Sequence, residues 1–284
     1  MPPPTFEDAA MSEFDVVIHL RNCEIAGPAV EAGLALARRL DAHVLGLHVV
    51  ALSTAAFVSP EAVAVQVNET GHLLEEARAR APWWREELDR HGLQGEFQVV
   101  QGDAIDALCH ASRWSDLVIA ERPCANPDAP VGWGIASRTV FGSSAPVVVV
   151  PEGARVDKVG QHMLVAWNAS RESMLAIRGA LPLLKRATRV TVLEGEPNVG
   201  LLGFDNLPKI DLRAWLKRHA IEAEFRPFKP ARDHGPALLE AANSAEADLI
   251  VIGAWGQSRI TELVLGGVTR HLFQHSNLPM LVAH

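Results

Sequence analysis

Hydrophobic and polar positions follow two patterns along this chain: short, β-rich apolar runs, and longer stretches with helical spacing. In the first half the apolar runs predict strands at 16–20, 44–50, 97–100, 117–120 and 147–150. The helical stretches between them predict helices around 27–40, 61–91, 103–113 and 132–142. Strands this apolar are buried on both faces, which is typical of a parallel sheet covered by helices.

The second half repeats this order. It has apolar runs near 163–167, 190–193, 223–228, 249–252 and 280–283, and a predicted helix around 267–275. The segments "SRTVFGSSAPVVVV" and "TRHLFQHSNLPMLVAH", which begin at Ser137 and Thr269, match as copies. One structural unit therefore occurs twice. The predicted fold class is α/β, with two tandem doubly wound domains. Each domain is a five-stranded, mostly parallel sheet flanked by helices. We predict a disordered N-terminus at 1–13, a first domain at 14–152 and a second domain at 158–284.

The stretch 61–91 is the hardest to interpret, because Pro82 interrupts its helical composition. Trp83 and Trp84 follow directly. They could form a platform for a ligand, but packing residues at a helix start are the better interpretation, since proline is tolerated there and aromatic area is useful in a core.

Length and composition fit two globular domains: 284 residues, 48% of them hydrophobic. No apolar run is long enough to span a membrane, and the N-terminus does not resemble a signal peptide. Met11 is a second candidate for the natural start. We expect a cytoplasmic protein with no membrane partner. Three cysteines, Cys23, Cys109 and Cys124, show no CxxC spacing and are expected to be reduced. The net charge of −8 argues against a nucleic-acid partner, although the second half is mildly basic.

A glycine-rich segment, "GAWGQSRITELVLGGVT", follows the predicted strand at 249–252 and leads into the last helix. It lies at the carboxyl end of a strand, where open α/β sheets bind ligands. Glycine lets a backbone turn sharply, and a helix start carries partial positive charge that suits phosphate. The predicted ligand is therefore an anion, most simply a phosphate chain.

The spacing Gly253-x2-Gly256-x9-Gly266 resembles the nucleotide-binding signature of the universal stress proteins, G-x2-G-x9-G-[S/T]. The resemblance covers about 14–284 as two tandem copies. It includes the "LGLHVV" second strand and the proline before each last strand. Two departures are informative: Gly267 stands where the family has Ser or Thr, and Asn168 stands where it has the Asp that holds the adenosine.

The resemblance implies that the second domain binds ATP or another adenine nucleotide, with Mg as the only metal. Phosphates would contact the amides of Gly256, Gly266, Gly267 and Val268 and the hydroxyl of Thr269, and the adenosine would lie near Ala166 and Asn168. It also implies a regulatory stress-response role through an unidentified protein partner, with slow hydrolysis at most, and an internal pseudo-dimer that pairs through the last strands. Whether two chains also form a homodimer is left open. The alternative is a nucleotide-independent interaction or small-ligand-binding protein with a vestigial pocket.

The first copy departs further from the signature. Glu121 and Cys124 stand opposite Gly253 and Gly256, while Gly134 alone is retained. Arg21 replaces the aspartate of the first strand. A carboxylate at 121 repels phosphate and non-glycine residues restrict the turn, so we expect this copy not to bind a nucleotide in the usual way.

Catalytic signatures are missing from the sequence. There is no GxSxG elbow, no GxxxxGK[ST] loop and no SGGxDS loop of the ATP pyrophosphatases. His271 and His275 share a helix face but lack a third ligand, so solvent-facing histidines are a better interpretation than a metal site. Ser170 is best interpreted as a helix cap. We therefore predict no catalytic residues.

Overall fold

The computed structural model describes residues 12–51, 60–123, 134–196, 208, 210–254 and 267–284, and for 60–68 the backbone alone. The N-terminus predicted to be disordered, 1–13, lies mostly outside the described residues. Ser12, within that range, is anchored: its Oγ donates to the Asp41 carbonyl at 2.6 Å and accepts from the His43 amide at 3.1 Å.

Ten strands form one sheet, in the order β3-β2-β1-β4-β5-β10-β9-β6-β7-β8. The strands are β1 (Asp15–Leu20), β2 (His43–Ala51), β3 (Gly95–Gly102), β4 (Leu117–Arg122), β5 (Val147–Pro151), β6 (His162–Trp167), β7 (Arg189–Glu194), β8 (Glu224–Pro227), β9 (Leu249–Gly253) and β10 (Met280–Ala283). Every pair within β1–β5 and within β6–β10 is parallel. This confirms the predicted α/β fold class.

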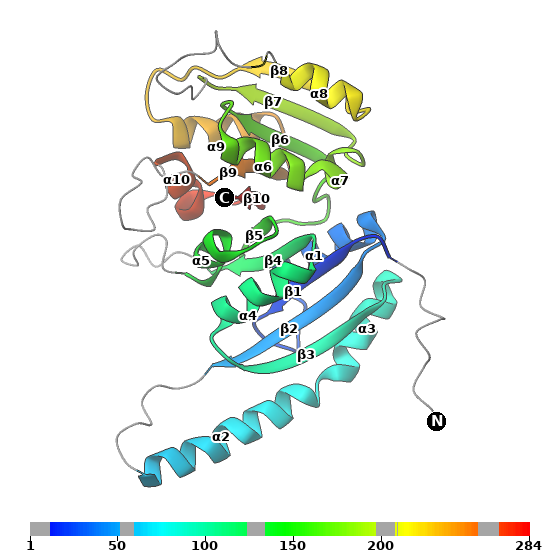
Figure 1. The fold of residues 1–284 in the computed structure, drawn as a ribbon, viewed down its shortest axis with the longest axis vertical. Helices are drawn as coiled ribbons and strands as arrows, with labels where there is room; N and C mark the ends of the chain where they lie inside the picture. The colour runs from blue at the N-terminus through cyan, green and yellow to red at the C-terminus, as the bar shows by residue number, and fades with distance from the viewer. Residues whose placement is uncertain (1–11, 52–59, 124–133, 197–207, 209, 255–266) are drawn as a thin grey trace.

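The two halves join through their last strands. β5 and β10 pair antiparallel, with Leu281 opposite Val148, so two five-stranded sheets form one continuous sheet (Figure 1). The predicted pairing of the last strands is therefore observed. Arg122, at the end of β4, reinforces the junction by donating to the Phe273 and Ser276 carbonyls of the other half.

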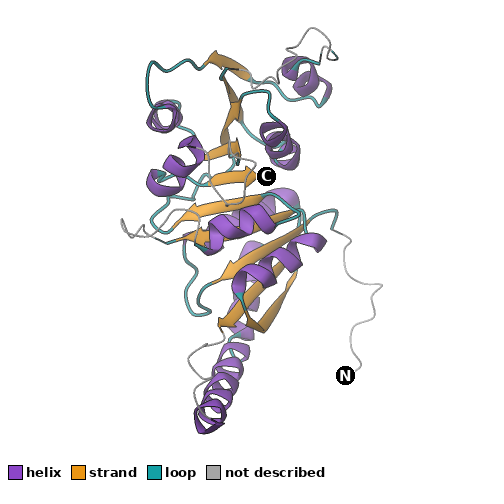
Figure 2. Ribbon diagram, turned by 60° about the vertical axis from the view of Figure 1, so that its left-hand side comes forward, coloured by secondary structure: helices purple, strands orange, loops and turns teal. Residues whose placement is uncertain are grey.

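Helices cover both faces of the sheet (Figure 2). One face carries α1 (Pro28–Leu40), α3 (Ala81–His91), α6 (Arg171–Gly179), α7 (Leu181–Leu184) and α8 (Leu212–Arg218). The other carries α4 (Ala104–Ala111), the 3-10 turn η2 (Ser112–Trp114), α5 (Ile135–Gly142), α9 (His234–Ser244) and α10 (Gly267–His275). Each face packs one apolar cluster with residues from both halves, because the strands present Val, Ile and Leu on both sides.

The predicted single helix at 61–91 is wrong. The chain forms two helices, α2 (Pro60–Arg78) and α3, and α2 projects past the edge strand β3 (Figure 1). Pro82 lies in the first turn of α3, where its missing N–H leaves no intrahelical bond unmade. Trp84 is 1% exposed and donates from Nε1 to the Glu96 carbonyl at 2.8 Å, so its interpretation as a packing residue is confirmed.

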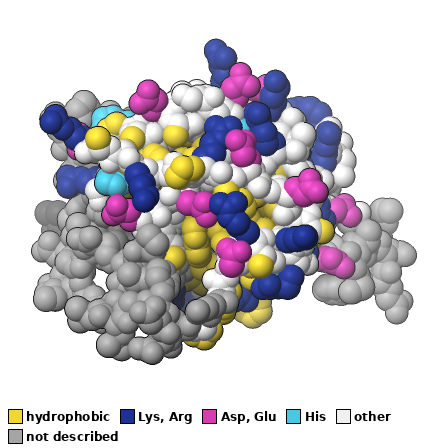
Figure 3. All heavy atoms as spheres, turned by 90° about the horizontal axis from the view of Figure 1, so that it is seen from above, with side chains coloured by type: hydrophobic (Ala, Val, Ile, Leu, Met, Phe, Trp, Pro, Cys, Tyr) yellow, Lys and Arg dark blue, Asp and Glu magenta, His cyan; other side chains and the backbone are white. Residues whose placement is uncertain are grey.

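The end of the molecule that carries β8 and α8 has a mixed surface. Basic and acidic side chains are interspersed over its described part, with a strip of exposed hydrophobic atoms between them (Figure 3). Among the described residues, no helix combines the length and the apolar character that a membrane crossing requires.

Candidate functional site

The candidate site lies where β6 and β9 end side by side. β6 leads into α6 on one face of the sheet, whereas β9 leads toward α10 on the other, so the connections diverge at this point. Ligands of open α/β sheets bind at such divergence points, at the carboxyl ends of the strands. Val165 pairs with Val251, which brings Asn168 and Gly253 together at this edge.

Asn168 starts the turn into α6. Its Oδ1 accepts a hydrogen bond from the Ser170 amide at 3.2 Å, and Ala169 between them has a left-handed φ of 58°. Ser170 Oγ accepts from the Ser173 amide at 3.1 Å, which confirms Ser170 as the cap of α6. Asn168 and Ala166 are both half-buried, so each has surface that a ligand can contact.

Gly253 has a packing role that is independent of any ligand. A Cβ at this position would lie 2.4 Å from the Glu172 carbonyl carbon and 2.5 Å from the Ser173 nitrogen. The start of α6 therefore requires a glycine at the end of β9. This requirement could have been anticipated only from the fold, since the sequence alone suggests close approach of a ligand equally well.

The start of α10 supplies the third part of the site. Gly267 is exposed, Val268 is half-buried and Thr269 is 3% exposed. A Cβ at Gly267 would meet no atom of the described residues within 4 Å. The first amides of a helix carry a partial positive charge that favours anions. Gly256 and Gly266 lie outside the described residues.

The same place in the first half is built differently. Ile18 pairs with Ile119 as Val165 pairs with Val251, so His19, Arg21 and Glu121 are the counterparts of Ala166, Asn168 and Gly253. Arg21 and Glu121 form an ion pair with each other. The carboxylate expected to repel phosphate is thus balanced by a guanidinium, and the two side chains occupy the place together. The ion pair between Arg21 and Glu121 was not among the features predicted from the sequence.

His19 adds a buried imidazole to this filled place. It is 5% exposed, and its Nδ1 has no hydrogen-bond partner. Burial, assisted by the nearby His48 and Arg21, lowers the pKa of His19 from 6.5 to about 4. His19 is therefore neutral in the folded protein at neutral pH.

We expect His19 to make the protein sensitive to acid. Between about pH 6.5 and 4 the unfolded chain binds a proton at His19 that the folded protein does not, so the free energy of unfolding falls as the pH falls through this window. The loss between pH 7 and 5 is on the order of 1–2 kcal/mol. Urea unfolding at pH 7 and pH 5 should show that the free energy of unfolding falls less for His19→Ala than for the wild type. Equal losses in the two proteins would contradict His19 as the source of the acid sensitivity. His110→Ala, which removes an exposed histidine, is the control.

His271 and His275 lie close, with ring centroids 4.4 Å apart. His275 is exposed as expected, but His271 is half-buried, because its Cβ packs against Gly235 at the start of α9. Within the described part of the chain, no three His, Cys, Asp or Glu side chains are arranged to hold a metal. Burial raises the pKa of the Cys23 thiol to about 11, so this cysteine is unreactive at neutral pH.

Comparison with known proteins supports this architecture. Residues 160–284 match the model of the universal stress protein family. A search of curated proteins found no match.

Three solved structures share the fold over nearly the whole chain. A universal stress protein from Archaeoglobus fulgidus DSM 4304 is 16% identical, with a TM-score of 0.70, and the match covers 95% of this chain and 97% of that one. A putative universal stress protein from Pseudomonas aeruginosa UCBPP-PA14 is 13% identical (TM-score 0.59, 97% and 95% covered). A functionally unknown protein from Pseudomonas aeruginosa PAO1 is also 13% identical (TM-score 0.59, 96% and 94% covered). These likenesses show the fold, and the family match shows that residues 160–284 form a domain of the universal stress protein family.

Proposed function

We propose that the protein is a tandem universal stress protein, with domains at 14–152 and 158–284, whose second domain binds an adenine nucleotide of the ATP type. The observation that carries the proposal is the difference between the two equivalent places. The second half has small residues, Ala166 and Gly253, and the first half has a buried histidine and an ion pair. Among the described residues, the first half thus carries large charged side chains at the place where the second half carries small ones, which favours the second half as the binding half.

The described residues suit the two ends of such a ligand. The exposed start of α10, at Gly267 and Val268, favours phosphate. Asn168, across the edge at the end of β6, can donate from its amide nitrogen to a ribose or base while its Oδ1 holds the α6 turn. Magnesium would accompany the phosphates. The output we propose is regulatory, through a change in contacts with a protein partner, rather than catalytic.

One observation favours the alternative, a protein that works without a nucleotide. The start of α6 requires Gly253 for packing, so that glycine would persist in the fold even after nucleotide binding had been lost. Mass spectrometry of small molecules released from the purified, denatured protein distinguishes the two. Near-stoichiometric ATP, ADP or AMP supports the proposal. If none is released, and a calorimetric ATP titration to about 1 mM is flat, the alternative holds.

Gly267→Ser is expected to tighten ATP binding about tenfold. It adds a hydroxyl at the start of α10, and a hydrogen bond to a charged group contributes about 1.5–3 kcal/mol. Among the described residues the added Cβ meets no atom within 4 Å, so we expect little steric cost. Calorimetric titration with Mg-ATP gives the dissociation constant.

Ile135→Ser is the matched control, because Ile135 is the first residue of α5, the counterpart of α10 in the first half. We expect this variant to bind ATP as the wild type does. An equal gain in both variants would contradict a site confined to the second half.

A further inference from the structure

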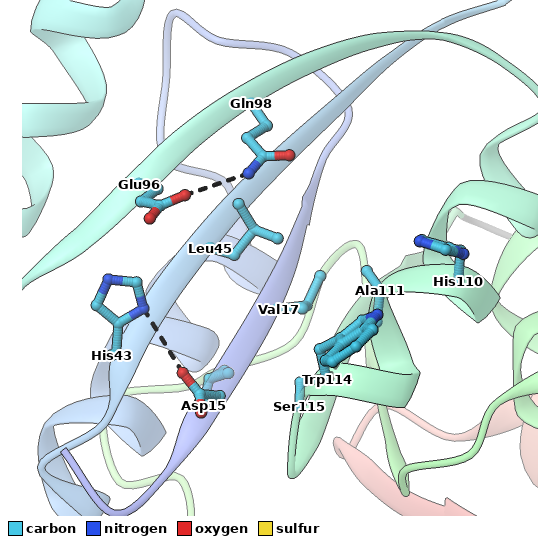
Figure 4. A pocket seen from close by; sticks show the side chains of 11 residues that line it. Asp15, Val17, His43, Leu45, Glu96, Gln98, His110, Ala111, Trp114 and Ser115 are labelled. Carbon is cyan, nitrogen blue, oxygen red and sulfur yellow. Dashed lines mark hydrogen bonds and ion pairs between the residues drawn. The ribbon is translucent and has the colours of Figure 1, made fainter.

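A cavity of about 350 Å³ lies in the first half, between the sheet and the α4–η2 segment. Leu45 on β2 and Val17 on β1 form its floor, and Trp114 on η2 stands across from them (Figure 4). The volume is at the lower end of the ~300–1,000 Å³ typical of small-molecule sites, so the cavity suits a compact ligand. It opens at the amino ends of the strands, whereas the proposed nucleotide site lies at carboxyl ends in the other half.

The Asp and Glu side chains that line the cavity give its wall a negative charge. Asp15 and Glu96 contribute carboxylates, and no Lys or Arg is among the described residues that line it. Asp15 Oδ1 lies 3.6 Å from His43 Nδ1, and Glu96 accepts from Gln98 Nε2 at 3.2 Å (Figure 4). Both carboxylates are exposed and can therefore meet a ligand from solvent.

Trp114 gives the cavity an aromatic wall. Its side chain is 77% exposed, more than any other large hydrophobic residue in the described part of the chain. An indole face attracts cations through its negative π-surface, more strongly than the rings of Phe or Tyr. The cavity thus combines the exposed indole of Trp114, an apolar floor and two carboxylates. This combination suits a ligand that carries a positive group on an apolar body.

The second copy of the fold gives an internal comparison. The Asp15 amide donates to Asp116 Oδ2 as the His162 amide donates to Asp248 Oδ2, which fixes the two halves in the same register. Strand pairing then makes the following residues counterparts: Asp15 and His162, His43 and Arg189, Leu45 and Thr191, Glu96 and Glu224, Gln98 and Arg226.

In the second copy two of these counterparts are arginines. Arg189 donates to His162 Nδ1 at 3.1 Å and to the Ala245 carbonyl at 3.2 Å, so its side chain crosses the region. Arg226 pairs with Glu224 at 2.7 Å and neutralises it. The first half has no arginine at either position, and its carboxylate at 96 is left facing the cavity.

From these observations we propose that the cavity beside Trp114 is a binding site for a small organic cation, with the apolar body against Trp114 and Leu45 and the charged group between Asp15 and Glu96. Neither the nucleotide site nor the fold requires an exposed indole at this position.

The test uses benzyltrimethylammonium as the probe, on the full chain at about pH 8, where unperturbed imidazoles are uncharged. Calorimetry and tryptophan-indole NMR should show binding with a dissociation constant on the order of 1 mM. The indole signal that is missing in Trp114→Phe should be the one that shifts. The neutral N,N-dimethylbenzamide and the anionic phenylacetate should bind at least about tenfold more weakly.

Two variants locate the site. Trp114→Ala should weaken binding about tenfold, and Gln98→Arg, which copies Arg226 from the second half, should abolish it by pairing with Glu96. Glu224→Gln, which removes the charge of the counterpart of Glu96 in the second half, should leave binding unchanged. The proposal is overturned if the probe does not bind, if the neutral or anionic compound binds equally well, or if Gln98→Arg and Glu224→Gln have the same effect.

Discussion

Gly253→Ala is expected to lower the free energy of unfolding by about 3 kcal/mol. The new Cβ would lie within 2.5 Å of backbone atoms of Glu172 and Ser173, and backbone at a helix start cannot move aside as a flexible side chain can. Overpacking of a close-packed site costs about 1–3 kcal/mol, and a backbone clash belongs at the upper end. Urea unfolding followed by circular dichroism measures the difference.

Gly267→Ala is the control for this change, because it makes the same substitution where a Cβ meets no atom within 4 Å in the described part of the chain. In the first turn of α10 it should leave stability unchanged or raise it by up to about 1 kcal/mol, since alanine favours the helix over glycine. A Gly253→Ala variant as stable as the wild type, with nucleotide binding lost, would show instead that Gly253 serves the ligand.

Trp84→Ala is expected to cost about 3–5 kcal/mol, the usual range for removing a buried large aromatic side chain. Trp84 is 1% exposed and lies against Gly46, whose lack of a side chain leaves room for the indole. The variant also removes the donor that satisfies the Glu96 carbonyl. Thermal and urea unfolding should both register the loss.

Trp83→Ala gives the comparison within the same helix turn. Trp83 is half-buried, so its removal should cost clearly less than that of Trp84. Equal effects would contradict the view that only the second indole is part of the core.

The strands were predictable from sequence for a simple physical reason. Residues such as Val147–Pro151 and Leu249–Gly253 are buried on both sides of the sheet, and this requires uninterrupted apolar runs. The internal repeat then allowed the strands to be predicted twice, once in each half of the chain. The break between α2 and α3 was missed because both segments have helix-forming composition, and Pro82 fits a new first turn as well as it marks a disturbance within one helix.

The site was predictable only in part. Asn168 and Gly253 lie at the ends of neighbouring strands, as the strand order requires, but the sequence does not show that Gly253 touches the backbone of α6. The pairing of Arg21 with Glu121 could have been predicted, because opposite charges stand at the ends of two strands that are neighbours in this fold. The cavity at Trp114 had no such signal in the sequence, because η2 is a 3-10 helix of three residues and is too short to show hydrophobic periodicity.

The antiparallel pairing of β5 with β10 places two copies of one unit in a single polypeptide. In an assembly of identical chains, a residue such as Arg21 would appear in every subunit and at every equivalent sheet edge. Here Arg21 stands at one edge and Asn168 at the equivalent place of the other. Covalent linkage therefore lets the two copies carry different side chains at equivalent positions, which a symmetric assembly of identical chains does not allow.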